Sequence, residues 1–101
     1  MKKEEAIKMI EGLADDNSHF KIGKTGQELP DRFDSEYKDD YDKINPICRS
    51  EKASLIDKWG KDLIAHFQAD DDYKDKCDND AVGGGEMDES DTYRLYVVVK
   101  R

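Results

Sequence analysis

The strongest constraint on this chain is the uneven placement of its charge. Residues 70–91 contain ten acidic and two basic side chains, which sum to −8, the formal net charge of the whole chain. The other residues hold 15 acidic and 15 basic side chains and are neutral together. The acidic segment also has three consecutive glycines at 83–85 and few apolar residues, so it cannot bury enough surface to offset the entropy of ordering. We therefore expect an acidic, mobile loop over 70–91 and a folded body built from the rest.

The length of 101 residues supports one hydrophobic core, so we expect a single domain over residues 1–101. Only 36% of the residues are apolar, and no apolar run approaches the ~20 residues that a membrane span needs. The opening sequence MKKEEAIKMIEG is too charged for a signal peptide. These features predict a soluble, cytoplasmic protein with no membrane partner, in which Cys48 and Cys77 remain reduced.

Hydrophobic periodicity predicts six elements in the body. The expected helices cover residues 2–14, residues 29–37 after a Thr-Gly turn, and a stretch that begins with Ser50 as N-cap and carries Ile56, Trp59, Leu63 and Phe67 on one face. The expected strands cover residues 19–24, 44–49 and 93–100, and the last of these, YRLYVVVK, has the strongest strand composition. The pattern predicts an α/β (α+β) fold with a small, three-stranded, mainly antiparallel sheet flanked by three helices.

Three familiar ligand motifs are incomplete. Gly23-Lys24-Thr25 resembles the end of a phosphate-binding loop, but Ser18 stands where that motif needs a glycine. The segment from Asp78 to Glu89 matches several positions of a calcium loop but has Val82 at a ligand position. The histidines and cysteines lack the paired spacing of a structural zinc site. We therefore predict no metal and no cofactor from these motifs.

A more specific pattern joins KIGKT at residues 21–25 with Arg32, nine residues after Gly23, and with a later helix that contains Leu63, Ile64 and Phe67. Over residues 19–68 this order resembles the GIY-YIG nuclease superfamily, particularly its phage-associated branches. The resemblance implies a GIY-YIG-like fold and, in an active member, DNA cleavage that uses a tyrosine, the arginine and a glutamate-bound Mg²⁺ or Mn²⁺ ion. An arginine and a divalent ion together stabilise the negative charge of a phosphodiester transition state.

The chain departs from that family pattern in two places. The strand that should precede KIGKT is missing, and Leu95-Tyr96-Val97-Val98 near the C-terminus resembles it instead. We therefore expect a circularly permuted arrangement, in which the last strand pairs antiparallel with residues 19–24 and brings Tyr96 to Arg32. The position of the metal-binding glutamate falls on Gly60, which has no side chain to bind a metal.

Three functions follow from these features. The first is a non-catalytic, GIY-YIG-like domain that binds nucleic acid or a nucleoprotein through Lys21, Lys24, Thr25 and Arg32. The second is a phage-derived acidic interaction or inhibitor protein whose 70–91 loop contacts a basic protein partner. The third is a metal-dependent DNA endonuclease with Tyr96 and Arg32 as catalytic residues. Structural roles stay open for the same residues: an exposed helical arginine at 32, a packed tyrosine at 96, and a glycine at 60 that allows close packing.

Overall fold

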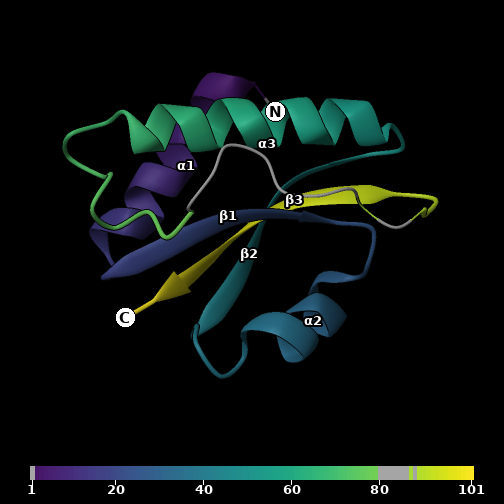
Figure 1. Cartoon of the computed structure of the whole chain (residues 1–101), viewed down its shortest axis with the longest axis horizontal. Helices are drawn as coiled ribbons and strands as arrows, with labels where there is room; N and C mark the ends of the chain where they lie inside the picture. The colour runs from purple at the N-terminus through teal and green to yellow at the C-terminus, as the bar shows by residue number, and fades with distance from the viewer. Residues whose placement is uncertain (1, 80–86, 88) are drawn as a thin grey trace.

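The computed structural model describes residues 2–79, 87 and 89–101 (Figure 1). The elements follow in the order α1 (Lys3–Asp15), β1 (His19–Thr25), α2 (Leu29–Arg32), the π-helical turn η1 (Phe33–Tyr37), β2 (Lys43–Ser50), α3 (Ala53–Gln68) and β3 (Tyr93–Lys100). The predicted α+β architecture is confirmed: the three strands form one antiparallel sheet, and helices lie on both of its faces. Within the described residues, no helix is long and apolar enough to cross a bilayer.

The C-terminal strand β3 is the centre of the sheet. The strand order is β1-β3-β2, and β3 pairs antiparallel with β1 in a register that sets Gly23 opposite Tyr96. The predicted pairing of the last strand with residues 19–24 is therefore confirmed. Residues 95–99 are all buried, because β3 has a strand on each side and helices above and below. This explains why its sequence is apolar at consecutive positions rather than alternating.

The two faces of the sheet carry separate cores. On one face, α1 and α3 cover side chains that include Phe20, Ile22, Leu95 and Val97. On the other, α2 and η1 cover a smaller cluster built on Tyr37, Tyr96 and Val98, with Leu29 and Phe33 packed against it. Leu29, Phe33 and Tyr37 are thus the spaced apolar residues of the predicted second helix. The alternation of side chains along each strand decides which of these two layers a residue joins.

The third helix begins later than predicted. Ser50 is the last residue of β2, where it pairs with Tyr93, and α3 begins at Ala53. The Ser50 hydroxyl accepts a hydrogen bond from the backbone N–H of Lys52, which is outside the helix. Pairing with β3 therefore extends β2 through the residue that sequence reasoning assigned to the helix N-cap.

The first part of the predicted acidic loop packs against the body. Tyr73 and Cys77 lie against the main core, and the backbone of Phe20 accepts from Asp78 N–H at 2.8 Å and donates to the carbonyl of Lys76 at 2.9 Å. Residues 70–79 are therefore part of the folded body, because hydrogen bonds to the edge of β1 supply order that their composition does not suggest. Residues 80–86 and 88 of the predicted loop, with most of the calcium-loop pattern, lie outside the described residues.

Candidate functional site

Tyr96 and Arg32 lie together on the face of the sheet covered by α2 and η1. The Nε of Arg32 donates a hydrogen bond of 3.3 Å to the Tyr96 hydroxyl, as the predicted permuted arrangement requires. The Tyr96 hydroxyl also shares a 2.7 Å hydrogen bond with the hydroxyl of Tyr37. Gly23 makes this arrangement possible, because the Tyr96 ring occupies the space that a Cβ at position 23 would need.

Tyr96 has no exposed surface in this arrangement. Burial and the hydrogen bond to Tyr37 raise the pKa of Tyr96 well above its ordinary value, and they outweigh the opposite effect of Arg32. The phenol therefore stays protonated at neutral pH, where it accepts a hydrogen bond from the guanidinium and does not act as a base. The buried Tyr96 hydroxyl is therefore suited to hold the side chain of Arg32 in position through this hydrogen bond.

Arg32 is the exposed member of this group, with 29% of its side chain open to solvent. Its Nη1 lies 3.7 Å from Glu36, one helical turn later, and its guanidinium lies 5.9 Å from the centre of the Tyr37 ring. Partial burial lowers the pKa of Arg32. The hydrogen bond to Tyr96 and the nearby Tyr37 and Glu36 outweigh this effect, so the pKa lies above its ordinary value. Arg32 is thus a cation that Tyr96 and Glu36 hold in place, with part of its side chain open to solvent.

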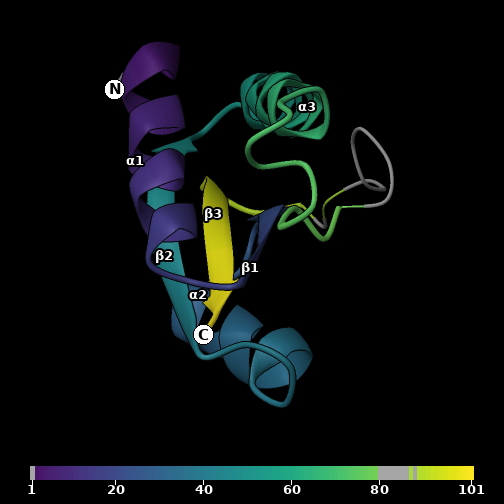
Figure 2. The same ribbon diagram turned by 90° about the vertical axis from the view of Figure 1, so that its left-hand side faces the viewer.

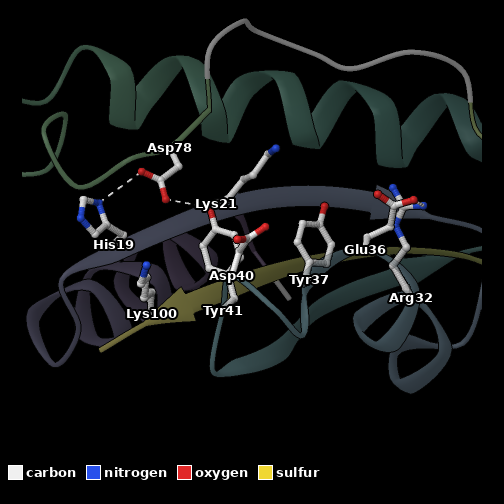
Figure 3. Close-up of a pocket in the computed structure, with 9 residues that line it drawn as sticks. All are labelled: His19, Lys21, Arg32, Glu36, Tyr37, Asp40, Tyr41, Asp78 and Lys100. Atoms are coloured by element: carbon white, nitrogen blue, oxygen red, sulfur yellow. Dashed lines mark hydrogen bonds and ion pairs between the residues drawn. The ribbon is translucent and has the colours of Figure 1, made fainter.

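A polar pocket of about 500 Å³ runs along β1 from this arginine (Figure 3). Its lining combines four basic and three acidic side chains with two tyrosines: His19, Lys21, Arg32, Lys100, Glu36, Asp40, Asp78, Tyr37 and Tyr41. The pocket is therefore close to neutral, in a chain whose net charge is −8. Its volume lies within the range of small-molecule sites, which is roughly 300–1,000 Å³.

Asp78 contacts both Tyr41 and His19 at the end of the pocket farthest from Arg32 (Figure 3). Its carboxylate accepts a 2.7 Å hydrogen bond from the Tyr41 hydroxyl and lies 3.2 Å from Nδ1 of His19. Burial and the hydrogen bond to Asp78 raise the pKa of Tyr41, so the phenol remains a donor. Sequence reasoning placed Asp78 in a solvated loop and assigned Tyr41 and His19 no role. The spacing of Tyr37 and Tyr41 by four residues was the available signal.

The predicted basic residues do not share one face. Lys21 lines the large pocket, whereas the ammonium group of Lys24 pairs with Asp57 of α3 and is only 12% exposed. Lys21 and Lys24 therefore work on opposite sides of the sheet, as the alternation along a strand requires. Thr25 is buried, and its hydroxyl accepts from the backbone N–H of Gln27.

A second pocket, of about 220 Å³, lies at the end of β1. Its lining includes Lys24, Thr25 and Arg32, so Arg32 borders both pockets. Of the four residues predicted to bind nucleic acid, Arg32 and Lys21 meet in the larger pocket, and Lys24 and Thr25 join Arg32 only in the smaller one.

Gly60 lies on the other side of the sheet from Arg32. It is buried where α3 crosses β3, and a Cβ at this position would lie 3.3 Å from a methyl group of Leu95. The glycine therefore allows α3 to pack closely against β3. A longer side chain at position 60 would begin on the α3 side of the sheet, opposite to Arg32. Among residues 2–79, 87 and 89–101, no group of three or more His, Cys, Asp or Glu side chains lies close enough to hold a metal ion.

The layer formed by α2, η1 and the following turn is strongly acidic on its outside. Between residues 28 and 42 the chain has seven acidic and two basic side chains, a net charge of −5, and all seven carboxylates are exposed. The net charge outside residues 70–91 is zero, because basic residues elsewhere in the body balance these seven carboxylates. A count of net charge alone therefore does not indicate this acidic surface.

Comparison of the chain with models of protein families, with curated proteins and with solved structures finds no match.

Proposed function

We propose that this protein binds nucleic acid, alone or within a nucleoprotein, through the Arg32 and Lys21 pocket and does not cleave it. The observation that carries the proposal is the contact between Arg32 and Tyr96, which holds a guanidinium in place beside a pocket that also contains Lys21. Arginine recognises phosphate through its rigid fork of N–H donors, and a fork that is already fixed loses less entropy on binding.

The same contact supports a GIY-YIG-like ancestry, because a permuted member would need β3 beside β1 and Tyr96 beside Arg32. The absence of cleavage rests on two observations. Tyr96 is fully buried and protonated, and position 60 lies across the sheet from Arg32. Neither a tyrosine base nor a metal ligand at position 60 therefore reaches a phosphate bound at Arg32. Such a protein would work in the cytoplasm, where its two thiols stay reduced.

The test measures the fluorescence anisotropy of labelled single-stranded and duplex oligonucleotides at low salt. Two phosphate contacts on a single strand predict a slope of about −1.4 in log K against log salt. Arg32→Ala and Lys21→Ala should each weaken binding, whereas Lys8→Ala, on the exposed side of α1, should not. Equal affinity in all four proteins, or no binding at low salt, would contradict the proposal.

A plasmid assay with Mg²⁺ or Mn²⁺ tests the non-catalytic part. We expect no cleavage above background. Cleavage that disappears in Arg32→Ala would restore the endonuclease interpretation, with Tyr96 and Arg32 as its catalytic residues and the metal as its cofactor.

The exposed acidic layer favours a second candidate, a protein that binds a basic partner. Because residues 76–79 hold the edge of β1, deletion of residues 70–91 would disturb the sheet, and neutralisation of charges is the cleaner test. The triple variant Asp31→Asn, Asp34→Asn, Asp39→Asn changes only exposed carboxylates outside both pockets. It should raise affinity for nucleic acid under the first proposal and lower affinity for a basic protein under the second.

A further inference from the structure

The two ends of the large pocket are built differently. Arg32 and Glu36 lie at one end, and Asp78, His19 and Tyr41 lie at the other, with Lys21 and Tyr37 between them (Figure 3). The first end borders the smaller pocket through Arg32. The other end is crossed by the hydrogen bond between Tyr41 and Asp78, two residues that are 37 positions apart in the chain.

This crossing is anchored on both sides. The backbone N–H of Asp78 donates to the carbonyl of Phe20 at 2.8 Å, which fixes Asp78 to the edge of β1. The ring of Tyr41 packs edge to face on the ring of Tyr37, with ring centres 5.7 Å apart, and the backbone N–H of Tyr41 donates to the carbonyl of Tyr37 at 2.8 Å. A polymer that ran through the pocket would therefore have to break a bond between two fixed segments.

Charge at the crossed end opposes a passing backbone as well. Asp40 lies beside Lys21 and Asp78 lies at the crossed end (Figure 3), so a phosphate next to one bound at Arg32 and Lys21 would approach two carboxylates. Like charges a few ångströms apart near a protein surface repel one another, most at low salt. Lys100 at this end offsets that repulsion for one additional charge and not for a row of phosphates.

We propose that the pocket receives the phosphorylated end of a nucleic-acid strand rather than the middle of its backbone. This inference rests on the proposed nucleic-acid function. A terminal phosphate monoester carries a charge of about −1.5 to −2 at neutral pH, more than the single charge of a backbone diester. Its interaction with Arg32 and Lys21 is therefore stronger, and the rest of the strand would leave past Arg32 toward the smaller pocket. The shared chemistry is a terminal phosphate, at either the 5′ or the 3′ end.

The experiment compares four single-stranded DNA molecules of one sequence, each with an internal fluorophore. One carries a 5′-phosphate, one a 3′-phosphate, one has hydroxyl groups at both ends, and one is a covalently closed circle. We expect one of the phosphorylated strands to bind roughly tenfold more tightly than the hydroxyl-ended strand, the scale of one added charge-assisted hydrogen bond. We expect the circle to bind most weakly of the four.

Tyr41→Phe removes the bond that crosses the pocket and should bring the affinity of the circle toward that of the linear strands. Tyr73→Phe is the matched control, because its hydroxyl bonds to Asp15 outside the pocket. Asp40→Asn gives a second measurement if Tyr41→Phe is poorly folded, and it should also reduce discrimination against the circle.

Equal affinity for all four molecules, lost in Arg32→Ala, would overturn this inference and leave the proposed function standing. Binding to none of them, or binding that Arg32→Ala leaves unchanged, would overturn the proposed function and this inference with it.

Discussion

Gly23 and Tyr96 face each other across the β1–β3 pairing, and the tyrosine ring fills the space that a side chain at residue 23 would occupy. This relationship places the Tyr96 hydroxyl within reach of Arg32 and Tyr37. The geometry of the candidate site therefore depends on the absence of a side chain in a neighbouring strand.

Gly23→Ala should destabilise the fold, because its Cβ would overlap the buried Tyr96 ring. Overpacking of this kind costs typically about 1–3 kcal/mol in free energy of unfolding. Urea denaturation measures the change. Gly12→Ala is the control, since nothing lies within 4 Å of a Cβ there, in the last turn of α1. It should stabilise the protein by up to ~1 kcal/mol. A stable Gly23→Ala protein would show that Tyr96 can move aside.

Tyr96→Phe removes the hydroxyl that contacts both Arg32 and Tyr37. We expect a loss of about 1–2 kcal/mol in free energy of unfolding, because Tyr37 is left with a buried, unpaired hydroxyl. We also expect weaker binding of oligonucleotides, because Arg32 loses its support. Denaturation and anisotropy measure the two effects. Loss of stability with unchanged binding would mean that Tyr96 does not position Arg32.

Asn79 protects the open edge of β1. Its side-chain carbonyl accepts from the N–H of Ile22 at 2.9 Å, and its amide donates to the Ile22 carbonyl at 2.8 Å, as a paired strand would. Asn79→Ala should cost about 1–2 kcal/mol, because both backbone groups lose their partner. Hydrogen exchange at the Ile22 amide should become faster. Asn79→Asp keeps the acceptor and lacks the amide donor, so its free energy of unfolding should lie between those of the wild type and Asn79→Ala. Unchanged hydrogen exchange at the Ile22 amide in Asn79→Ala would refute this role of Asn79.

Asp57 couples stability to acid pH. Hydrogen bonds from Lys24 and Lys61 hold the pKa of Asp57 below its ordinary value. A carboxyl whose pKa is lower in the folded protein contributes stability above its unfolded pKa of about 3.9, and this contribution disappears as pH falls through the folded value. Stability measured by denaturation should therefore decline below about pH 4, and Asp57→Asn should reduce that decline. Asp39→Asn, an exposed control, should leave the acid profile unchanged. Identical profiles for wild type and Asp57→Asn would contradict the coupling.

Local patterns in the sequence determined most of the elements. The run from Tyr93 to Lys100 predicted β3, and the spaced residues Ile56, Leu63 and Phe67 predicted the buried face of α3. The spacing of KIGKT and Arg32, together with the missing first strand, also predicted that β3 pairs with β1 and that Tyr96 reaches Arg32. The elements follow from short-range periodicity, whereas the pairing of β3 with β1 was predicted from the family resemblance, which requires a strand beside KIGKT.

Only the tertiary structure shows which basic residues line the large pocket and which contact crosses its end. Lys21 and Lys24 separate onto opposite faces because side chains alternate along β1, and Asp57 of α3 then captures Lys24. Asp78 lies in a segment whose composition indicates a solvated loop, yet the open edge of β1 orders that segment and brings Asp78 to Tyr41. These two contacts depend on how α3, β1 and the segment after α3 pack together, and no motif in the sequence indicated them.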